Sequence, residues 1–374
     1  MWESFMKKII IPVWSALSGV RKEKKEILSA VNRVFRSGIF ILGKECEAFE
    51  DKFAQFCTTR YGIGVGNGTD AIFLALKALD IGTGDEIITV PNTAIPTVSA
   101  IVTSGARPVF TDVLSDTLLM DPTKIAAALT KRTKAIIPVH LYGQCCRMDE
   151  IMALAKAHRI PVIEDCAQSH GAEWKGKKSG SFGMLAAFSF YPTKVLGAYG
   201  DAGMVLTQKK DLEQKLRMLR MYGMKGTYDA YIHGYNSRLD EVHAAILSKK
   251  LTHIKTYIAK RRNIASWYNT HLSSLPLTLP SQDPRAGHVF HLYVVRYKKR
   301  DDIILFLKKM GIAAAIHYPQ PIHLMRAYKF LGYSKGDFPI AELACREVFS
   351  LPMYPQLQKK DQERITSALK AFFS

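Results

Sequence analysis

The sequence contains only six cysteines in 374 residues, and they form no pattern typical of a metal or disulfide site. None stands in a Cys-x-x-Cys spacing, and the adjacent pair Cys145 and Cys146 suits neither a zinc knuckle nor a disulfide framework. We therefore expect free thiols in a reducing compartment, no metal site and a cytoplasmic protein.

Long apolar runs are also missing. The longest uncharged run, residues 87–106, is long enough to span a bilayer, but it contains two prolines, Asn92 and several Thr and Ser residues. The N-terminal stretch MWESFMKKIIIPVW has a short apolar core and no small-residue cleavage site, so it is a poor signal peptide. The sequence thus predicts no membrane span and no membrane partner.

Acidic residues are in a minority, because 52 Lys and Arg stand against 33 Asp and Glu, a net charge of +19. A nucleic-acid-binding module should gather this charge in one tract. Here the basic residues are scattered as pairs and triplets, such as 260–262 and 298–300. We therefore expect a basic, solvated surface and no nucleic-acid partner. With 48% hydrophobic residues, the chain is long enough for two folded domains.

Short β-rich runs alternate with helical stretches from Tyr61 to about Leu206. This alternation predicts βαβ crossovers and a parallel or mixed sheet covered by helices on both faces. The expected strands are 61–66, 86–90, 108–113, 134–140, 161–165, 186–190 and 203–207, and the expected helices between them are 69–79, 95–104 and 148–158. The core domain is therefore expected to be α/β.

Other elements flank this pattern. The expected helices are 23–35 and 44–57 before it, 211–222 and a long stretch 238–272 after it, and 301–310, 340–349 and 360–372 near the end, with a strand at 290–297. A Pro-rich break separates the last group from the rest. We expect a large α/β domain over residues 1–274 and a smaller C-terminal α+β domain over residues 275–374.

Ligands of open α/β sheets gather where strands end, so the polar residues there are candidates for a site. In GVGNGTDA, Gly68 lets the backbone approach a ligand, and Thr69 lies where a helix start favours phosphate; a plain turn and helix cap is the alternative. In VIEDCAQSH, Asp165 ends an apolar strand and needs a cation or several donors. The alternative for Asp165 is a helix cap onto Gln168.

Two further segments carry candidates. In AAFSFYPTKVLGAYGDAG, Ser189 lies at a strand end and Lys194 follows in a loop rich in Pro and Gly. Most lysines are solvent-exposed, but a desolvated lysine has a lowered pKa and can form a Schiff base. In HGYNSRLDE, Asn236 and Arg238 precede a helix; a helix start capped by Ser237 or Asp240 is the alternative.

These four sites together match the requirements of pyridoxal 5'-phosphate (PLP). A lysine holds its aldehyde, and a carboxylate keeps its pyridine nitrogen protonated, so that the ring can accept electrons from a carbanion. The sequence therefore predicts a transamination.

Blocks along nearly the whole chain strengthen this interpretation. They are GNGTDAI, GARPVFTDV, DPTKI, KAIIPVHLYGQ, VIEDCAQSHGA, GSFG, FSFYPTK, GAYGDAG, NSRLDEVHAAIL, HYPQPIHL and LPMYP. Because these blocks occur in this order, the chain resembles the sugar aminotransferases of the DegT/DnrJ/EryC1/StrS family. The resemblance implies the aspartate-aminotransferase fold (PLP fold type I), with a three-layer large domain around a mixed, mostly parallel sheet.

The resemblance also implies roles for the candidates. Lys194 looks like the residue bonded to the cofactor, Asp165 like the partner of the pyridine nitrogen, and Gln168 like the group against the ring or its hydroxyl. The implied phosphate holders are Gly68, Thr69 and Ser189. Asn236 resembles the residue that reaches the phosphate of the neighbouring subunit's cofactor, which implies a homodimer with shared sites.

The implied substrates are glutamate as amino donor and a nucleotide-linked keto-sugar as acceptor. HYPQPIHL, with His317, Tyr318 and His323, resembles the segment of relatives that aminate carbon 3 of a dTDP- or UDP-hexose. Tyr222 is a further candidate sugar contact. A packed or surface position is the alternative for the two histidines and for Tyr222.

The chain departs from the family pattern at Val195, where Asn is usual, at Ala202 in GDAG, and at Ala94, where many relatives place an aromatic residue over the ring. Some relatives that dehydrate sugars carry histidine where Lys194 stands, so the lysine favours amino transfer. The alternatives are a PLP-dependent dehydratase, transfer to carbon 4 or to a cyclitol, and a catalytically silent regulator that binds a polyanion.

Overall fold

The computed structural model describes residues 11–226 and 228–374. Its centre is a mixed sheet in the order β1-β9-β8-β5-β4-β2-β3, in which parallel bridges Ile136–Val162 and Val139–Asp165 join the β5 and β4 segments. The strands are β1 (Tyr61–Val65), β2 (Glu86–Thr89), β3 (Arg107–Phe110), β4 (Thr133–Ile136), β5 (Ile163–Asp165), β8 (Leu185–Ser189) and β9 (Gly203–Thr207). Only β9 runs antiparallel to its neighbours, so the predicted fold class is confirmed.

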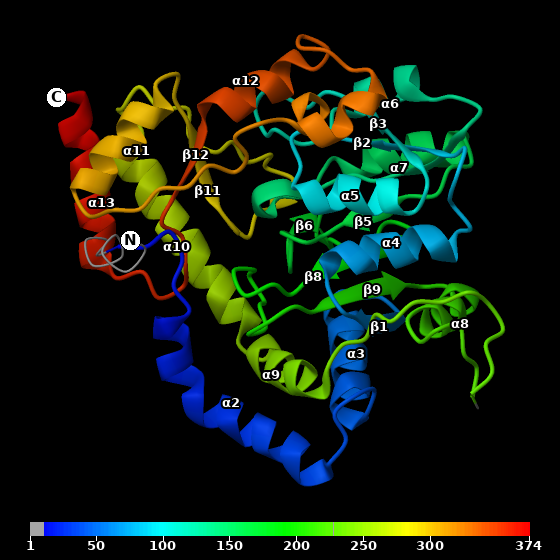
Figure 1. Ribbon diagram of the computed structural model, residues 1–374. Helices are drawn as coiled ribbons and strands as arrows, with labels where there is room; N and C mark the ends of the chain where they lie inside the picture. The colour runs from blue at the N-terminus through cyan, green and yellow to red at the C-terminus, as the bar shows by residue number, and fades with distance from the viewer. Residues whose placement is uncertain (1–10, 227) are drawn as a thin grey trace.

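Helices cover both faces of this sheet (Figure 1). On β8, Leu185 and Ala187 belong to one apolar core and Ala186 and Phe188 to the other, as the alternation of side chains along a strand requires. The first core includes residues of α4 (Gly68–Ala78), α5 (Ile95–Thr103) and α8 (Lys210–Leu219). The second includes residues of α3 (Lys44–Phe56), α7 (Met148–Ala157), α9 (Glu241–Leu251) and α10 (Ile254–Leu272).

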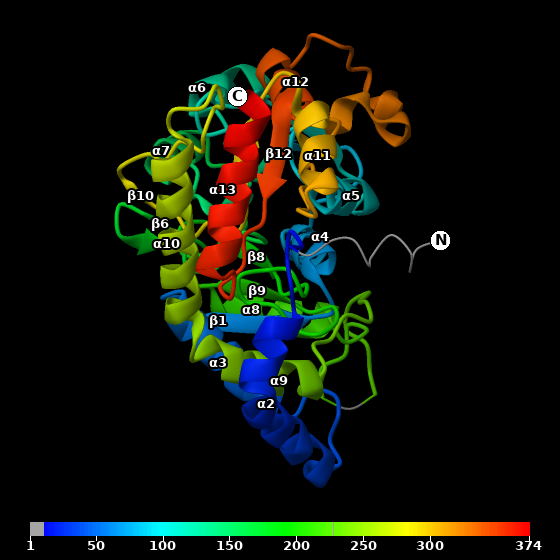
Figure 2. The same cartoon turned by 90° about the vertical axis from the view of Figure 1, so that its left-hand side faces the viewer.

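A third core lies in the C-terminal part of the chain. There β11 (Tyr293–Arg296) pairs antiparallel with β12 (Val348–Leu351), and α11 (Arg300–Lys309) and α13 (Lys359–Phe373) pack near them. Figure 2 shows α13 beside α10, whose C-terminal half contributes Tyr268 to this core. Ile11 also joins it, because its backbone pairs with Gly311 and Ala313. The domain boundary at residue 275 stays a prediction.

Two predicted helices are wrong in their extent. The stretch 238–272 is divided into α9 and α10, because the N–H groups of Thr252 and His253 turn back onto the carbonyls of Lys249 and Lys250. The helix expected over 340–349 is α12 (Pro339–Glu347), and the chain then leaves it as β12 because this segment pairs with β11. Tertiary pairing thus overrides the local helical pattern.

Other elements were not predicted or begin elsewhere. The helix α2 (Leu17–Ser37) begins before the expected residue 23 and packs against α9. The unpredicted elements are α6 (Pro122–Ala128), β6 (Glu173–Trp174), β7 (Lys177–Lys178), β10 (Ala286–Gly287) and the 3₁₀ helices η1 (Leu141–Gly143), η2 (Ile322–Leu324) and η3 (Arg326–Leu331). Each is too short to give a periodic signal in the sequence.

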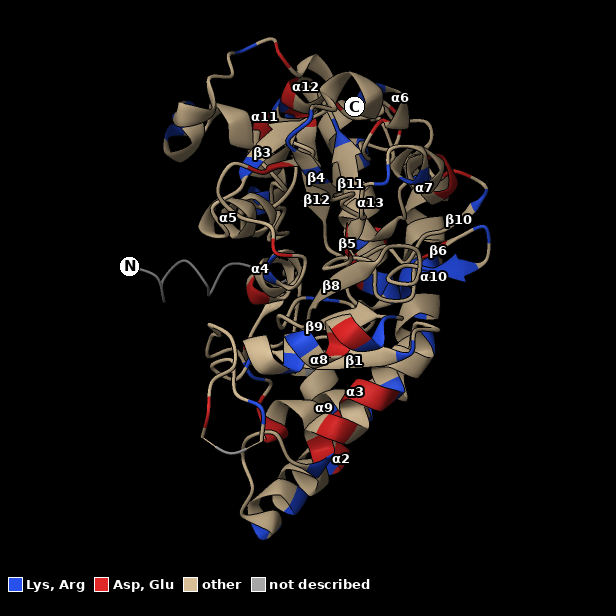
Figure 3. Cartoon of the chain, turned by 90° about the vertical axis from the view of Figure 1, so that its right-hand side faces the viewer, with Lys and Arg blue, Asp and Glu red and all other residues tan. Residues whose placement is uncertain are grey.

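Three expectations from composition can be compared with the structure. All six cysteines are free, as predicted, and all six are buried. No helix among the described residues has the length and apolarity to cross a bilayer. Most of the N-terminal stretch that we judged a poor signal peptide lies outside the described residues. On the face in Figure 3, Lys and Arg are interspersed with Asp and Glu over many elements.

Candidate active site

A cavity of about 650 Å³ lies where β5 and β8 end and α4 begins. It brings together most of the site residues predicted from the sequence: Gly68, Thr69, Asp165, Gln168, Ser189, Lys194, His317 and Tyr318. Ala94, at the position where the resemblance led us to look for an aromatic residue, lines it as well. Asn236, Tyr222 and His323 are not among its lining residues.

The first turn of α4 forms one wall of this cavity. Asn67 caps the helix, because its Oδ1 accepts a hydrogen bond of 2.8 Å from the N–H of Asp70. A Cβ added to Gly68 would lie 2.5 Å from the Cβ of Ser189, so only glycine lets the helix start approach the end of β8 this closely. Unpaired N–H groups at a helix start attract anions, and this turn therefore fits the phosphate of PLP.

Asp165 is only 4% exposed and is held by two donors. Its Oδ2 accepts a hydrogen bond of 2.7 Å from the Thr97 hydroxyl, and its Oδ1 accepts one of 3.1 Å from the N–H of Ala167. The alternative of a helix cap onto Gln168 is wrong, because no helix follows β5 directly. The carboxylate is thus fixed in the cavity, as a partner of the pyridine nitrogen requires.

Lys194 lies in the turn after β8, where its N–H donates to the carbonyl of Tyr191. Burial lowers the pKa of its amine to about 8, although the negative charge of Asp165 opposes this effect. A much larger fraction of this amine is uncharged near neutral pH than for an ordinary lysine. The Lys194 amine therefore fits the aldehyde of PLP, as the α4 turn fits its phosphate and Asp165 its pyridine nitrogen.

Gln168 links the cavity to the C-terminal part of the chain. Its Oε1 accepts a hydrogen bond of 2.7 Å from the N–H of Tyr142, and its Nε2 donates one of 3.1 Å to the Tyr318 hydroxyl. Burial raises the pKa of Tyr318 to about 12, so this phenol stays protonated. Burial and the charge of Lys194 lower the pKa of His317 to about 4, so its imidazole is neutral.

The remaining candidates lie elsewhere. His323 is 1% exposed, and its Nε2 lies 3.2 Å from Glu342 Oε1 while its ring packs on Phe338. The packed alternative is therefore the one that the structure gives for His323, in place of the predicted sugar contact. Tyr222 is 45% exposed beside the guanidinium of Arg238, and Asn236 is exposed as well.

Sequence reasoning missed the role of Ser237 as a link between two segments. Its hydroxyl donates to Asp70 Oδ2 at 2.6 Å and accepts from the N–H of Gly66 at 3.0 Å. Ser237 is therefore no helix cap, and Asp240, which precedes α9, makes no capping hydrogen bond with its side chain either. These bonds hold the segment around Asn236 against the first turn of α4.

Thr93, Thr97 and His291 also line the cavity and were not predicted. Thr93 Oγ1 lies 2.8 Å from Thr97 Oγ1, four residues later. Thr97 lies in the first turn of α5, but Thr93 precedes that helix, so helical spacing does not explain the pair and gave no signal in the sequence. His291 carried no signal, because only tertiary packing brings it to the cavity.

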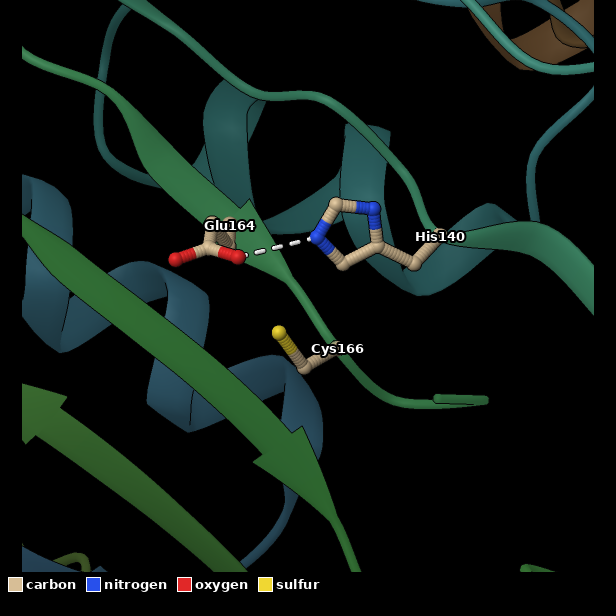
Figure 4. A group of neighbouring side chains, drawn as sticks. All are labelled: His140, Glu164 and Cys166. Atoms are coloured by element: carbon tan, nitrogen blue, oxygen red, sulfur yellow. Dashed lines mark hydrogen bonds and ion pairs between the residues drawn. The ribbon is translucent and has the colours of Figure 1, made fainter. Parts of the chain in front are cut away.

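Glu164, on the opposite face of β5 from Asp165, forms a cluster with His140 and Cys166 (Figure 4). Such residue types can hold a metal, but Glu164 already accepts hydrogen bonds from the N–H groups of Gly180, Phe182 and Gly183 and from His140 Nε2. His140 Nδ1 accepts from the N–H of Cys146. With these acceptors engaged, we interpret the cluster as structural support for β5.

Comparisons with known proteins agree with this geometry. A sequence model described as the DegT/DnrJ/EryC1/StrS aminotransferase family matches residues 21–370. The chain is 47% identical to the dTDP-3-amino-3,4,6-trideoxy-alpha-D-glucose transaminase of Micromonospora megalomicea over 366 residues, which cover 96% of this chain and 97% of the relative.

Two solved structures extend the comparison. The structure of S. venezuelae DesV in complex with a ketimine intermediate matches with a TM-score of 0.95 and 39% identity, covering 98% of each chain. The PLP form of the putative sugar aminotransferase Spr1654 from Streptococcus pneumoniae matches with a TM-score of 0.88 and 25% identity, covering 93% of this chain and 95% of that one.

Proposed function

Because the chain belongs to the DegT/DnrJ/EryC1/StrS aminotransferase family, we propose that it transfers an amino group from glutamate to carbon 3 of a dTDP- or UDP-linked keto-hexose. The enzyme is PLP-dependent. The observation that carries the proposal is that Lys194, Asp165 and the first turn of α4 line one cavity. The name of the Micromonospora relative, a 3-amino-sugar transaminase, supports carbon 3.

Each site residue has a proposed task in binding the cofactor. The α4 turn with Gly68 and Thr69, together with Ser189, holds the phosphate. Asp165 would pair with the pyridine nitrogen and keep it protonated, and Gln168 would contact the ring or its hydroxyl. When bound, PLP supplies an electron sink for the negative charge that develops on the substrate carbon.

Lys194 is the proposed acid and base. With a pKa near 8, its Nζ would accept a proton from the donor's α-carbon and give it up at the cofactor carbon, because both forms of the amine are populated near neutral pH. Its partly buried position limits competing protonation by water. His317 and Tyr318 are uncharged at this pH, and we propose that they contact the hydroxyl groups of the sugar.

The test compares three samples: the cofactor-free chain, the same chain loaded with PLP, and a Lys194→Ala variant. Lys177→Ala, at an exposed lysine, is the control. Incubation with glutamate and a panel of 3-keto and 4-keto sugar nucleotides should release 2-oxoglutarate only from loaded chains that retain Lys194, and fastest with a 3-keto acceptor. Faster release with a 4-keto sugar would refute the proposed position. No release with any acceptor would refute the proposed substrate class.

We also propose a homodimer in which Asn236 of one copy serves the cofactor of the other. Asn236 and Tyr222 are exposed and lie outside the cavity of their own chain, and Ile95 and Tyr191 at the cavity are about half exposed. A second copy would cover these groups.

Mixing two inactive variants tests this arrangement. In a hybrid of Lys194→Ala with Asn236→Ala, one of the two sites has both residues intact, so activity should return on mixing. If both residues served one chain, mixed samples would stay inactive.

Two further statements about the chain remain proposals. We propose a cytoplasmic protein, which six buried, free cysteines support because thiols persist in reducing compartments. We also propose the boundary between domains 1–274 and 275–374. A C-terminal core supports a second domain, and Ile11 and Tyr268 from the first range join that core as well. Expression of residues 275–374 alone tests the boundary, since a domain with its own core should unfold cooperatively.

A further inference from the structure

A second, smaller cavity adjoins the loop that carries Lys194. Its volume is about 50 Å³, and Lys194 lines both this cavity and the larger one. A cavity of that size has room for roughly three water-sized groups. The charged residues that line it are Glu23, Lys194, Lys250 and Arg261.

Lys250 is partly buried next to the Lys194 loop. Its Nζ donates to the carbonyl of Gly197 and lies 4.7 Å from the centroid of the Tyr199 ring. Burial lowers the pKa of Lys250 to about 8, and the negative charge of Glu23 opposes this effect. Glu23, which accepts a hydrogen bond from the Tyr257 hydroxyl, is therefore the counter-charge of Lys250.

Arg261 is the unusual member of the cavity, because it is 1% exposed and has no counter-ion among the described residues. Its Nη1 donates to the carbonyls of Phe290, His291 and Met353, whereas its Nε is buried without a hydrogen-bond partner. Burial lowers the pKa of Arg261 to about 10, so the guanidinium still carries its charge at neutral pH. A buried charge without a counter-charge is costly.

The four charges can be compared. The negative charge of Asp165 acts on Lys194 and that of Glu23 acts on Lys250, whereas Arg261 forms no ion pair with any described residue, so its positive charge is uncompensated there. We propose that the small cavity binds one monovalent anion of halide size, chloride, beside Arg261 and Lys250. This site takes no part in the proposed amino transfer, and it lies behind the lysine that performs it.

Thermal unfolding in chloride and in gluconate, at equal pH and ionic strength, tests the site. Chloride should raise the unfolding temperature in a saturable manner, because a ligand that binds only the folded state stabilises it. Gluconate is too large for the cavity and should not. Equal unfolding temperatures in both salts would overturn the proposal, whether or not the protein proves to be an aminotransferase.

Crystals grown in bromide give a direct readout on the unchanged protein. We expect an anomalous peak between the side chains of Arg261 and Lys250. A cavity that holds only water under these conditions would overturn the proposal.

Two substitutions should move chloride binding in opposite directions. Lys250→Met removes a cation and should abolish the chloride effect, whereas the matched neighbour variant Lys249→Met should keep it. Glu23→Gln removes the negative charge but retains an oxygen for Tyr257, so it should tighten chloride binding by about tenfold or more. If the Glu23→Gln variant binds chloride no more tightly than the unchanged chain, the argument that the charge of Glu23 opposes chloride binding is wrong. This outcome can be read even if Lys250→Met does not fold.

Discussion

Thr97→Val removes one hydroxyl from the site and keeps the shape of the side chain. Thr97 Oγ1 donates to Asp165 Oδ2 at 2.7 Å, and both side chains are buried. Because a carboxylate can only accept, the hydroxyl hydrogen of Thr97 is committed to Asp165, and Thr93 must donate to Thr97. The substitution therefore leaves Asp165 with the N–H of Ala167 as its remaining donor.

The expected magnitude follows from this contact. A hydrogen bond to a charged group contributes about 1.5–3 kcal/mol, whereas one between neutral groups contributes about 0.5–1.5 kcal/mol. Thr97→Val should lower the free energy of unfolding of the cofactor-free protein by the larger amount. Since Asp165 also loses its fixed orientation, the dissociation constant for PLP should rise by about tenfold or more.

Urea unfolding and an absorbance titration with PLP measure both effects. Thr93→Val is the matched control, because Thr93 is equally buried and loses a hydroxyl without touching Asp165. Thr93→Val should lower the free energy of unfolding by the smaller amount, that of a hydrogen bond between neutral groups, and leave PLP binding nearly unchanged. If Thr97→Val is as stable as Thr93→Val and binds PLP as tightly, the argument that Thr97 positions Asp165 is refuted.

Three further predictions concern the same cavity. Gly68→Ala should cost about 1–3 kcal/mol of stability and weaken PLP binding in the same titrations, because the new Cβ would lie 2.5 Å from Ser189; Gly82→Ala, where a Cβ would make an ordinary contact, should do neither. Asp165→Asn should slow a single turnover with glutamate by more than about hundredfold, and a near-normal rate would contradict its role. Trapping of Lys194 by an aldehyde and borohydride should rise with pH with a midpoint near 8, because only the uncharged amine reacts. In Asp165→Asn this midpoint should fall, since Asp165 raises the pKa of Lys194; an unchanged midpoint would exclude that coupling.

Much of the site could be predicted because its residues stand where strands end. Asp165 and Ser189 each close an apolar run, and parallel or adjacent strands bring such ends to one edge of the sheet. Glycine at position 68 and the Pro- and Gly-rich loop around Lys194 mark close backbone approaches. These signals are local, so a single sequence contains them.

The parts that could not be predicted depend on contacts between distant segments. His323 looked like a sugar contact, but Glu342 and Phe338 hold it in the core, and neither is near it in a recognisable motif. Arg261 looked like one member of a basic surface triplet, yet three carbonyls from two later segments enclose it. Burial of a charged side chain is a property of the whole fold, which periodicity does not report.

The two adjacent carboxylates of β5, Glu164 and Asp165, have different roles in the fold. Successive side chains of a strand point to opposite faces, so Glu164 and Asp165 are separated by the sheet although they are adjacent in the chain. Glu164 is saturated by three backbone N–H groups and His140, which fixes the strand from behind. Among the described residues, Asp165 accepts two hydrogen bonds, so it keeps acceptor capacity for a ligand in the cavity. Glu164 thus holds the strand rigid, whereas Asp165 keeps hydrogen-bond acceptors free for a ligand. A single carboxylate could not do both, because hydrogen bonds that fix the strand use up the acceptors that a ligand needs.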